Sequence, residues 1–346
     1  MKKNSILFIT NGNITIGFGH IARDIVIAKE FANNGWNVQF LLPEDSIFVN
    51  DIKQLFNEKV YTIPLFSKKA IYSTIKKIVN NYNVKVIFVD LIEREYNSLS
   101  WLKEDFPNIL LVSMTLFLFP LDKRYEDISF FPDMKEYKFD DSFKLFSGPS
   151  YFVFRDEFKN IKKNQRKIGD KILISMGGTD PYGITLQVLQ GLITSEYNIT
   201  VILSEYSPSF AYVNTMLQIH KCKVKLISFT NNIAKEMERH DIVIINGGMT
   251  RYEACIALTP FIAISINETQ YNITKQLTDV GVGINLGIYK NLNSEDINYA
   301  VSTLLSNYSQ RYEMSKIMKN LFRTDGHQKI YSSIINNIKY SDSDSK

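Results

Sequence analysis

The sequence has few of the residues that mark secreted, fibrous or disordered chains. Only two of its 346 residues are cysteine, Cys222 and Cys255, and their spacing fits neither a disulfide framework nor a C-x-x-C motif. Nine prolines, 16 glycines and 22% charged residues exclude collagen-like repeats and argue against intrinsic disorder. The cysteine content fits a reducing compartment, so we expect a cytoplasmic protein.

Long apolar runs and concentrated charge are also missing. The start of the chain is basic and then apolar for about six residues, without a small-residue cleavage site, which indicates a strand rather than a signal peptide. The most apolar stretch, 109–121, is shorter than the roughly 20 residues of a membrane-spanning helix. It indicates a buried strand and a hydrophobic loop, with a lipid-contacting patch as the alternative. The 40 Lys and Arg residues exceed the 36 Asp and Glu residues by four without a basic run, which favours small anionic ligands over nucleic acid.

What the sequence does have is apolar content, 45% hydrophobic over 346 residues, sufficient for about two domains with a core each. Short Val, Ile, Leu and Phe runs alternate with stretches of helical periodicity, which is typical of βαβ units. The predicted strands cover 5–10, 37–42, 59–64, 85–90 and 108–112, then 171–176, 199–203, 223–228, 241–246, 261–266 and, more weakly, 281–286. The clearest predicted helices cover 21–33, 69–80, 99–105, 294–306, 310–321 and 328–338.

A polar stretch separates the two βαβ series. Periodicity fades from 122 to 170, where we expect the linker between domains. The predicted fold class is α/β, with two Rossmann-like doubly wound parallel sheets facing a cleft at the carboxyl ends of their strands. We expect an N-terminal domain over 1–160, a C-terminal domain over 161–340 and a disordered tail over 341–346.

The first predicted strand is followed by a turn with two glycines and a histidine, residues 11–20. Gly17 and Gly19 permit close ligand approach, and the helix that opens here favours an anion at its amino terminus. His20 would lie beside that anion as a general base, the alternative being a capping or packing histidine. The loose match to a dinucleotide fingerprint begins too far beyond the strand, which disfavours a dehydrogenase.

A second turn, SMGGTD at 175–180, follows the first strand of the second half. Gly177, Gly178 and Thr179 make a phosphate-facing or interdomain loop, and a simple tight turn is the alternative. No lysine follows the glycines as a P-loop requires, so a P-loop NTPase is disfavoured.

The third turn, NGGMTRYE at 246–253, again joins a predicted strand to a helix. Gly247, Gly248 and the amides after them are suited to a diphosphate, and Glu253 to the hydroxyls of a ribose. The alternative is structural, because Thr250 and Glu253 have the spacing of a capping box.

Together with IGFGHIARD at 16–24 and GPSYFVFRDEF at 148–158, these two turns carry a family resemblance. The chain resembles the UDP-sugar hydrolases of pseudaminic acid biosynthesis and, more widely, the GT-B glycosyltransferase superfamily that includes the peptidoglycan N-acetylglucosaminyltransferase. The matching segments occur in the same order over both predicted domains. The resemblance is weakest across 113–145 and beyond about 291.

The resemblance implies that the first domain holds the sugar and the second the nucleotide. His20 matches the histidine that activates water for attack on the anomeric carbon of a UDP-linked 2,4-diacetamido-2,4,6-trideoxy sugar. Residues 230–233 match a segment whose backbone meets the base, Glu253 a ribose-binding glutamate and Gln270 a glutamine near the sugar. Besides catalytic His20, the expected substrate-binding residues are Gly17, Gly19, Arg23, Asp90, Gly177, Gly178, Thr179, Thr230, Asn232, Ile233, Gly247, Gly248, Met249, Thr250, Glu253, Thr269 and Gln270.

Two positions depart from the hydrolase pattern. Ile92 and Thr269 stand where the family has a tyrosine and an asparagine, whose hydrogen bonds they do not reproduce. These departures favour transfer, but the close match at 17–24 makes hydrolysis of a UDP-sugar in bacterial surface-glycan or nonulosonic acid biosynthesis the first hypothesis. Transfer to a glycan or lipid acceptor is the second, for which the apolar segment 116–120 is suited, and non-catalytic binding of a nucleotide sugar is the third. We expect no cofactor and no metal, because backbone amides can stabilise the leaving diphosphate.

Overall fold

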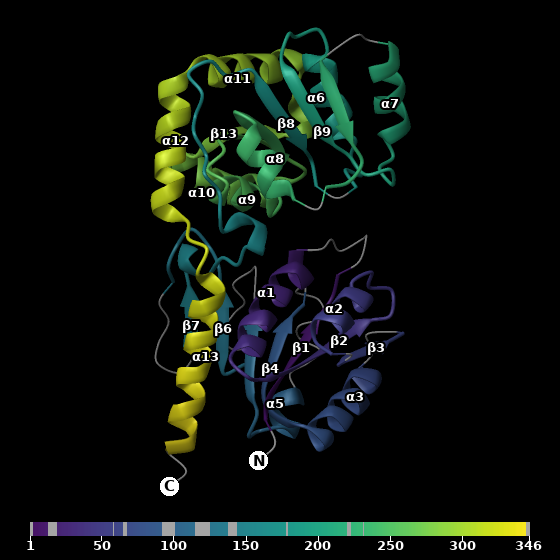
Figure 1. Ribbon diagram of the computed structural model, residues 1–346, viewed down its shortest axis with the longest axis vertical. Helices are drawn as coiled ribbons and strands as arrows, with labels where there is room; N and C mark the ends of the chain where they lie inside the picture. The colour runs from purple at the N-terminus through teal and green to yellow at the C-terminus, as the bar shows by residue number, and fades with distance from the viewer. Residues whose placement is uncertain are drawn as a thin grey trace. The chain divides into compact units, whose positions relative to one another are not determined.

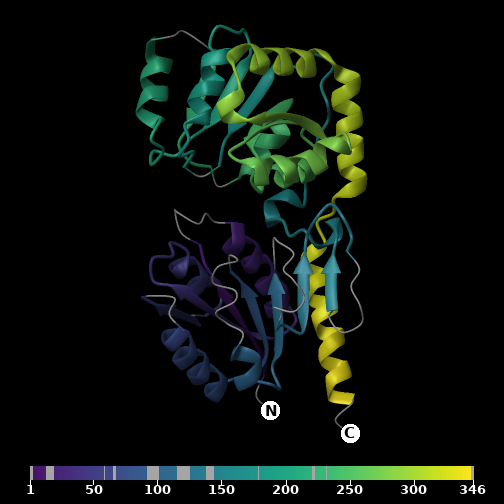
Figure 2. The ribbon, with the colours of Figure 1, turned by 180° about the vertical axis from the view of Figure 1, so that it is seen from behind.

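The computed structural model describes residues 3–12, 19–57, 59–64, 68–91, 101–114, 125–137, 144–177, 179–219, 223–230 and 232–343 (Figures 1 and 2). They group into two compact units, Met1–Arg155 with Thr324–Lys346, and Asp156–Arg323. The predictions at Gly17, Ile92, Gly178 and 116–120 lie outside the described residues.

The first unit is built on a parallel sheet of seven strands within the described residues. They are β1 (Asn4–Thr10), β2 (Asn37–Pro43), β3 (Val60–Ile63), β4 (Asn83–Asp90), β5 (Leu110–Met114), β6 (Ile128–Phe131) and β7 (Lys144–Ser147). Their order is β3-β2-β1-β4-β5-β6-β7, and every neighbouring pair is parallel. The strand order reverses between β1 and β4, so the carboxyl ends of these two strands flank a topological switch point.

Helices cover both faces of this sheet because alternate strand residues point to opposite sides. Phe8 and Phe40, whose rings stack at 5.0 Å, face the helices of one layer, while Leu7 and Ile9 face those of the other. The first layer contains α1 (Gly19–Asn33), α2 (Val49–Leu55) and α13 (Gly326–Ser343), and the second contains α3 (Lys68–Asn81) and α5 (Trp101–Asp105). Both faces of the sheet are thus buried, as the apolar strand runs predicted.

The predicted linker over 122–170 is wrong in its first part, because β6 and β7 lie within it. Each strand has only four residues, which is too short for periodicity to reveal. Phe130 of β6 is fully buried and stacks on Phe146 of β7 at 5.3 Å, so packing against the preceding strands stabilises both. Residues 159–170 form an irregular connection that leads into the sheet of the second unit, in agreement with the prediction.

The second unit repeats the same architecture. Its strands are β8 (Lys171–Ser175), β9 (Asn198–Ile202), β10 (Val224–Ile227), β11 (Ile242–Asn246), β12 (Phe261–Ser265) and β13 (Gly283–Ile288). They form a parallel sheet in the order β10-β9-β8-β11-β12-β13, with the reversal between β8 and β11. Gly283 fits against the ring of Phe261, since a Cβ there would lie 2.5 Å from it. The weakly predicted strand near 281–286 is therefore confirmed, although it contains glycine.

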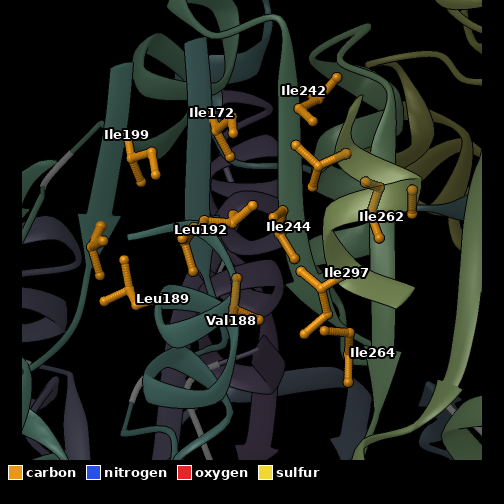
Figure 3. Close-up of a cluster of buried hydrophobic side chains, with 14 of the residues drawn as sticks. Ile172, Val188, Leu189, Leu192, Ile199, Ile242, Ile244, Ile262, Ile264 and Ile297 are labelled. Carbon is orange, nitrogen blue, oxygen red and sulfur yellow. The ribbon is translucent and has the colours of Figure 1, made fainter. Parts of the chain in front are cut away.

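Isoleucine and valine dominate the core on one face of this second sheet (Figure 3). Ile172, Ile244 and Ile262 from three strands pack against Val188 and Ile297 from the covering helices. The helices on this face are α6 (Ile184–Leu192), α7 (Phe210–Ile219) and α11 (Ser294–Ser306). The opposite face of the sheet is covered by α8 (Ile233–Arg239), α9 (Thr250–Ile256) and α10 (Glu268–Asp279). Helix α12 (Tyr308–Leu321) packs against α9 and α11. The predicted helix over 294–306 is confirmed in its bounds.

The last helix belongs to the first unit, not to the C-terminal domain in which we expected it. Ile330 and Ile334 of α13 are fully buried in the first unit's core, and the Tyr331 ring lies 4.9 Å from that of Phe31. The helix starts close against the main chain, because a Cβ on Gly326 would lie 2.1 Å from the Phe152 carbonyl oxygen. The expected domain over 161–340 therefore ends at residue 323. The expected disordered tail is wrong for 341–343, which are helical, and 344–346 lie outside the described residues.

Candidate active site

Tertiary structure brings three side chains together at the switch point of the first sheet. Thr10 and Asp90, the last residues of β1 and β4, are paired in register. The first turn of α1, beginning at exposed Gly19, holds His20 and then Arg23. Because carboxyl ends of parallel strands meet at one edge of the sheet, Asp90 reaches these residues from 70 positions away in the chain.

The three side chains form a compact, buried group. His20 Nδ1 lies 2.6 Å from Asp90 Oδ1. Arg23 donates from Nε to Asp90 Oδ2 and from Nη2 to Asp90 Oδ1, both at 2.5 Å, which is the two-pronged geometry of an arginine–carboxylate pair. His20 is 9% exposed, Arg23 5% and Asp90 0%. Arg23 and Asp90 were predicted to bind substrate, but these atoms of their side chains instead contact each other and His20.

The charges of this group indicate which nitrogen of His20 carries the proton. Burial alone would raise the pKa of Asp90, but the positive charge of Arg23 and contact with His20 hold that pKa well below its usual range. Asp90 is thus an ionised acceptor at neutral pH. His20 Nδ1 is 3.2 Å from Arg23 Nη2 and nearer to the Asp90 oxygen, so we assign its proton to the bond with Asp90. Nε2 then keeps its lone pair and can accept a proton, with the ring held in one tautomer.

A second group of predicted residues meets in the other unit, where Asn246 links two glycine turns. Asn246 Nδ2 donates to the Met176 carbonyl oxygen at 2.6 Å, and its Oδ1 accepts from the Gly248 amide at 3.0 Å. Both turns need glycine beside this side chain. A Cβ on Gly177, whose φ is +92°, would lie 3.0 Å from Asn246 Nδ2, and a Cβ on Gly248 would lie 2.9 Å from Asn246 Oδ1. We did not predict a role for Asn246. Its position as a polar residue at the end of a buried strand could have indicated one.

Gln270, predicted to lie near the sugar, lies against the third turn. A Cβ on Gly247 would lie 2.8 Å from Gln270 Cβ and 3.0 Å from Ser265 Oγ, so the turn requires glycine here. Gln270 Oε1 accepts from the Ile266 amide at 3.2 Å. Thr269 is exposed in the first turn of α10.

The capping-box alternative for the third turn is wrong. The N-cap of α9 is Met249, which has no capping side chain, and Thr250 is already the first helical residue. Glu253 is therefore not the partner of a Thr250 cap, and its half-buried carboxylate stays a candidate for polar ligand contacts.

The helix after the second turn offers less to a phosphate than predicted. Asp180 is 1% exposed, and its two oxygens accept from the Ile184 amide at 3.0 Å and the Thr185 amide at 2.8 Å. A carboxylate of the protein thus occupies the amino terminus of α6, where an anionic ligand would bind. Of the predicted residues here, Gly177 stays beside the third turn and Thr179 is half-buried next to the cap.

The segment predicted to meet the base uses its side chains locally. Thr230 Oγ1 accepts from the Asn232 amide at 3.2 Å, and Asn232 Oδ1 caps α8 by accepting from the Lys235 amide at 2.8 Å. Ile233 is buried in the core at 7% exposure. The side chains of these three residues are thus engaged within the second unit, and residue 231 lies outside the described residues.

Arg251 is a charged residue of the third turn that we did not predict. Its Nη1 donates to the carbonyl oxygens of Gly248, at 2.9 Å, and of Gly247, and its Nη2 donates to the Tyr252 hydroxyl at 3.1 Å. It is 5% exposed, and no carboxylate among the described residues pairs with it. A buried positive charge without a counter-charge beside two glycines favours an anionic ligand.

Neither a metal cluster nor a membrane helix is found in the part of the chain that the structure describes. No group of three or more His, Cys, Asp or Glu residues there has the arrangement of metal ligands. No helix in that part combines the length and apolar character needed to span a bilayer.

Comparison with known proteins supports the GT-B superfamily that the sequence resembles. The glycosyltransferase family 28 C-terminal domain matches residues 183–330. An uncharacterised protein of Methanocaldococcus jannaschii is 28% identical over 77% of this chain and 56% of its own length, and the spore coat polysaccharide biosynthesis protein SpsG of Bacillus subtilis is 27% identical over 50% and 52%. The matches thus span about half the length of these two relatives. The UDP-2,4-diacetamido-2,4,6-trideoxy-beta-L-altropyranose hydrolase of Campylobacter jejuni is 25% identical over 80% of this chain and 97% of its own.

Solved structures share the fold over nearly the whole chain. MurG of Acinetobacter baumannii superposes with a TM-score of 0.71 at 16% identity, covering 96% of this chain and 99% of its own. The calicheamicin glycosyltransferase gives 0.70 at 12% identity, covering 99% and 100%. The two parallel-sheet α/β units therefore have the fold of GT-B glycosyltransferases, and the predicted fold class is confirmed.

Proposed function

We propose that this protein cleaves the glycosyl–phosphate bond of a UDP-linked acetamido-deoxy sugar, with His20 as general base and water as the nucleophile. The observation that carries the proposal is the buried Asp90 carboxylate, which lies 2.6 Å from His20 Nδ1 at the switch point of the first sheet. A histidine oriented by a buried carboxylate is a recurrent means of activating a hydroxyl group. The 25% identity to a UDP-sugar hydrolase over 97% of that enzyme's length favours water as the nucleophile.

The proposed mechanism assigns one role to the residues of each unit. His20 Nε2 takes a proton from water as its oxygen bonds to the anomeric carbon. The bond from that carbon to the diphosphate oxygen breaks, and UDP leaves with the electron pair. Asp90 stabilises the imidazolium that forms, and Arg23 keeps Asp90 ionised and in place. Amides that follow Gly248 in the third turn, with Arg251 behind them, stabilise the charge on the leaving diphosphate.

Arg251→Met should raise the Kd for UDP by about tenfold to a hundredfold, since a hydrogen-bonded charge contributes about 1.5–3 kcal/mol. The substitution removes both the positive charge and the donors that hold the Gly247 and Gly248 carbonyls. Isothermal titration calorimetry with UDP measures the change. Arg239→Met is the matched control, because Arg239 is exposed and pairs with Glu236 at 3.3 Å. Equal affinities of the two variants for UDP would contradict a role of Arg251 in binding the diphosphate.

Transfer of the sugar to an acceptor hydroxyl is the second candidate. The same base would serve, with the proton coming from the acceptor rather than from water. The glycosyltransferase domain match over 183–330 favours it, as does Thr269 at the position where the hydrolases have asparagine. A glycan or a lipid would then be the acceptor.

The test is UDP release from a panel of UDP-N-acetylated and deoxyamino sugars without acceptor, followed by time-resolved NMR. The proposal expects stoichiometric appearance of UDP and free sugar, with the anomeric configuration of the first product visible. UDP-sugar binding with negligible release would support the transferase instead. Binding without turnover, even with hydroxyl acceptors added, would support a nucleotide-sugar binding protein.

A further inference from the structure

A second aspartate, Asp24, lies in the first unit close to the catalytic group but has no part in the mechanism above. It follows His20 by one helical turn on α1, so the two side chains lie on the same side of the helix. Its side chain is completely buried, and neither carboxyl oxygen has a regular hydrogen-bond partner. The hydroxyl of Thr10, which interacts with Asp24, also lacks a regular hydrogen bond.

The positive charge available near Asp24 is already used. Arg23, its chain neighbour, directs Nε and Nη2 to Asp90. The strands β1 and β2 that pack against α1 contribute no titratable side chain, and α13 places His327 near Glu30, 3.7 Å away and further along the helix. In the part of the chain that the structure describes, the ionisable groups around Asp24 are therefore His20, Arg23 and Asp90, with a single fixed positive charge among them.

Two ionised carboxylates beside that one cation would be unfavourable in a dry site. Burial, and next the negative charge of Asp90, raise the pKa of Asp24 well above its usual range. The pKa of Asp90 moves the opposite way, because Arg23 and His20 both contact its oxygens. When environments separate two neighbouring carboxyl groups in this manner, one carries the charge and the other the proton.

We propose that Asp24 is a neutral carboxylic acid in the working protein and is a positioning residue. It leaves Asp90 as the one carboxylate of the group, so that the single negative charge both balances Arg23 and accepts the Nδ1 proton of His20. An ionised Asp24 would add a second negative charge that favours doubly protonated His20, in which Nε2 has no lone pair to act as base. The positioning role rests on the proposed function of His20, whereas the protonation state of Asp24 does not.

The protonation state is tested by folding stability, without substrate. Above about pH 4 the unfolded chain releases the proton of Asp24 while the folded protein keeps it, so stability falls as pH rises. The amide of the Asp24→Asn variant has no such proton to lose. The unfolding constant of the wild type, divided by that of Asp24→Asn, should therefore rise about tenfold per pH unit from pH 5 upward until Asp24 ionises in the folded protein. Both tryptophans, Trp36 and Trp101, lie in the first unit, so their fluorescence in urea follows its unfolding.

A level ratio for Asp24→Asn from pH 5 to 8 would overturn the proposal. If Asp24→Asn does not fold, aspartate-selective ¹³C labelling of the wild type decides, since a neutral Asp24 gives a carboxylic acid signal at pH 7 and an ionised one does not.

The positioning role is tested by the pH profile of kcat/KM. Asp24→Asn preserves shape and neutrality, so we expect the acidic limb to stay at its wild-type position. A shift of that limb, or a hundredfold loss of kcat in a folded variant, would overturn the role. Failure of the wild type to turn over any UDP-sugar would count against the proposed function alone, because the stability and ¹³C measurements need no turnover.

Discussion

His20→Ala should lower kcat for UDP release by about 10²–10⁴-fold while leaving the Kd for UDP within about twofold, because a general base acts in the transition state and not in nucleotide binding. The loss follows from the geometry, because with His20 gone Asp90 keeps Arg23 as its partner and the proton-accepting Nε2 is missing. Stopped assays of UDP release and calorimetry with UDP give the two quantities separately.

Two controls distinguish catalysis from misfolding in this experiment. His240→Ala removes another buried histidine, whose ring contacts Thr200 Oγ1 at 2.9 Å and the Glu236 carbonyl at 2.6 Å in the second unit. This variant should retain kcat, and added imidazole should partly restore turnover by His20→Ala but not by unrelated inactive variants. Unchanged turnover by His20→Ala would eliminate the histidine as base under either the hydrolase or the transferase hypothesis.

Asp90→Asn should combine the largest loss of stability with a severe loss of activity. Removal of one partner from a buried ion pair costs about 3–5 kcal/mol, because the other charge remains buried without compensation. Arg23 is 5% exposed and directs two nitrogens at this carboxylate, so it is the stranded charge. Tryptophan fluorescence in urea measures the free energy of unfolding of the first unit. An amide also stops enforcing the His20 tautomer, for which we expect a fall in kcat of about 10³–10⁴-fold.

The double variant Arg23→Met with Asp90→Leu separates the two effects. Replacing both charges by apolar groups of similar size removes the stranded cation, so most of the lost stability should return. Activity should not return, since His20 still lacks its carboxylate. A contrary result would be a free energy of unfolding of Asp90→Asn within about 1 kcal/mol of the wild type, well below the cost of a stranded buried charge. The Arg23–Asp90 pair would then not be as buried as its low exposure indicates.

Strand and helix positions were largely readable from local pattern, because burial imposes its own period on the sequence. Apolar runs such as 37–42 and 261–266 are buried on both faces of a parallel sheet, and helix 294–306 shows an amphipathic repeat between capping residues. Helix α13 is equally periodic, but an apolar face does not say which core it will cover. Only the packing of Ile330 and Ile334 assigned it to the first unit.

The candidate site likewise has features that local sequence predicts and features that depend on tertiary contacts. Glycine turns after strands, and a histidine at a helix start, are local signals, so residues 19–20 and 247–248 were identified from the amino-acid sequence. The partnership of His20 with Asp90, the linking of two turns by Asn246 and the capping of α6 by Asp180 depend on side-chain direction and distance. Local residue pattern therefore determined the fold class and the positions of the glycine turns. Which charges neutralise one another was decided by tertiary structure, because electrostatic interaction depends on distance and burial rather than on order along the chain.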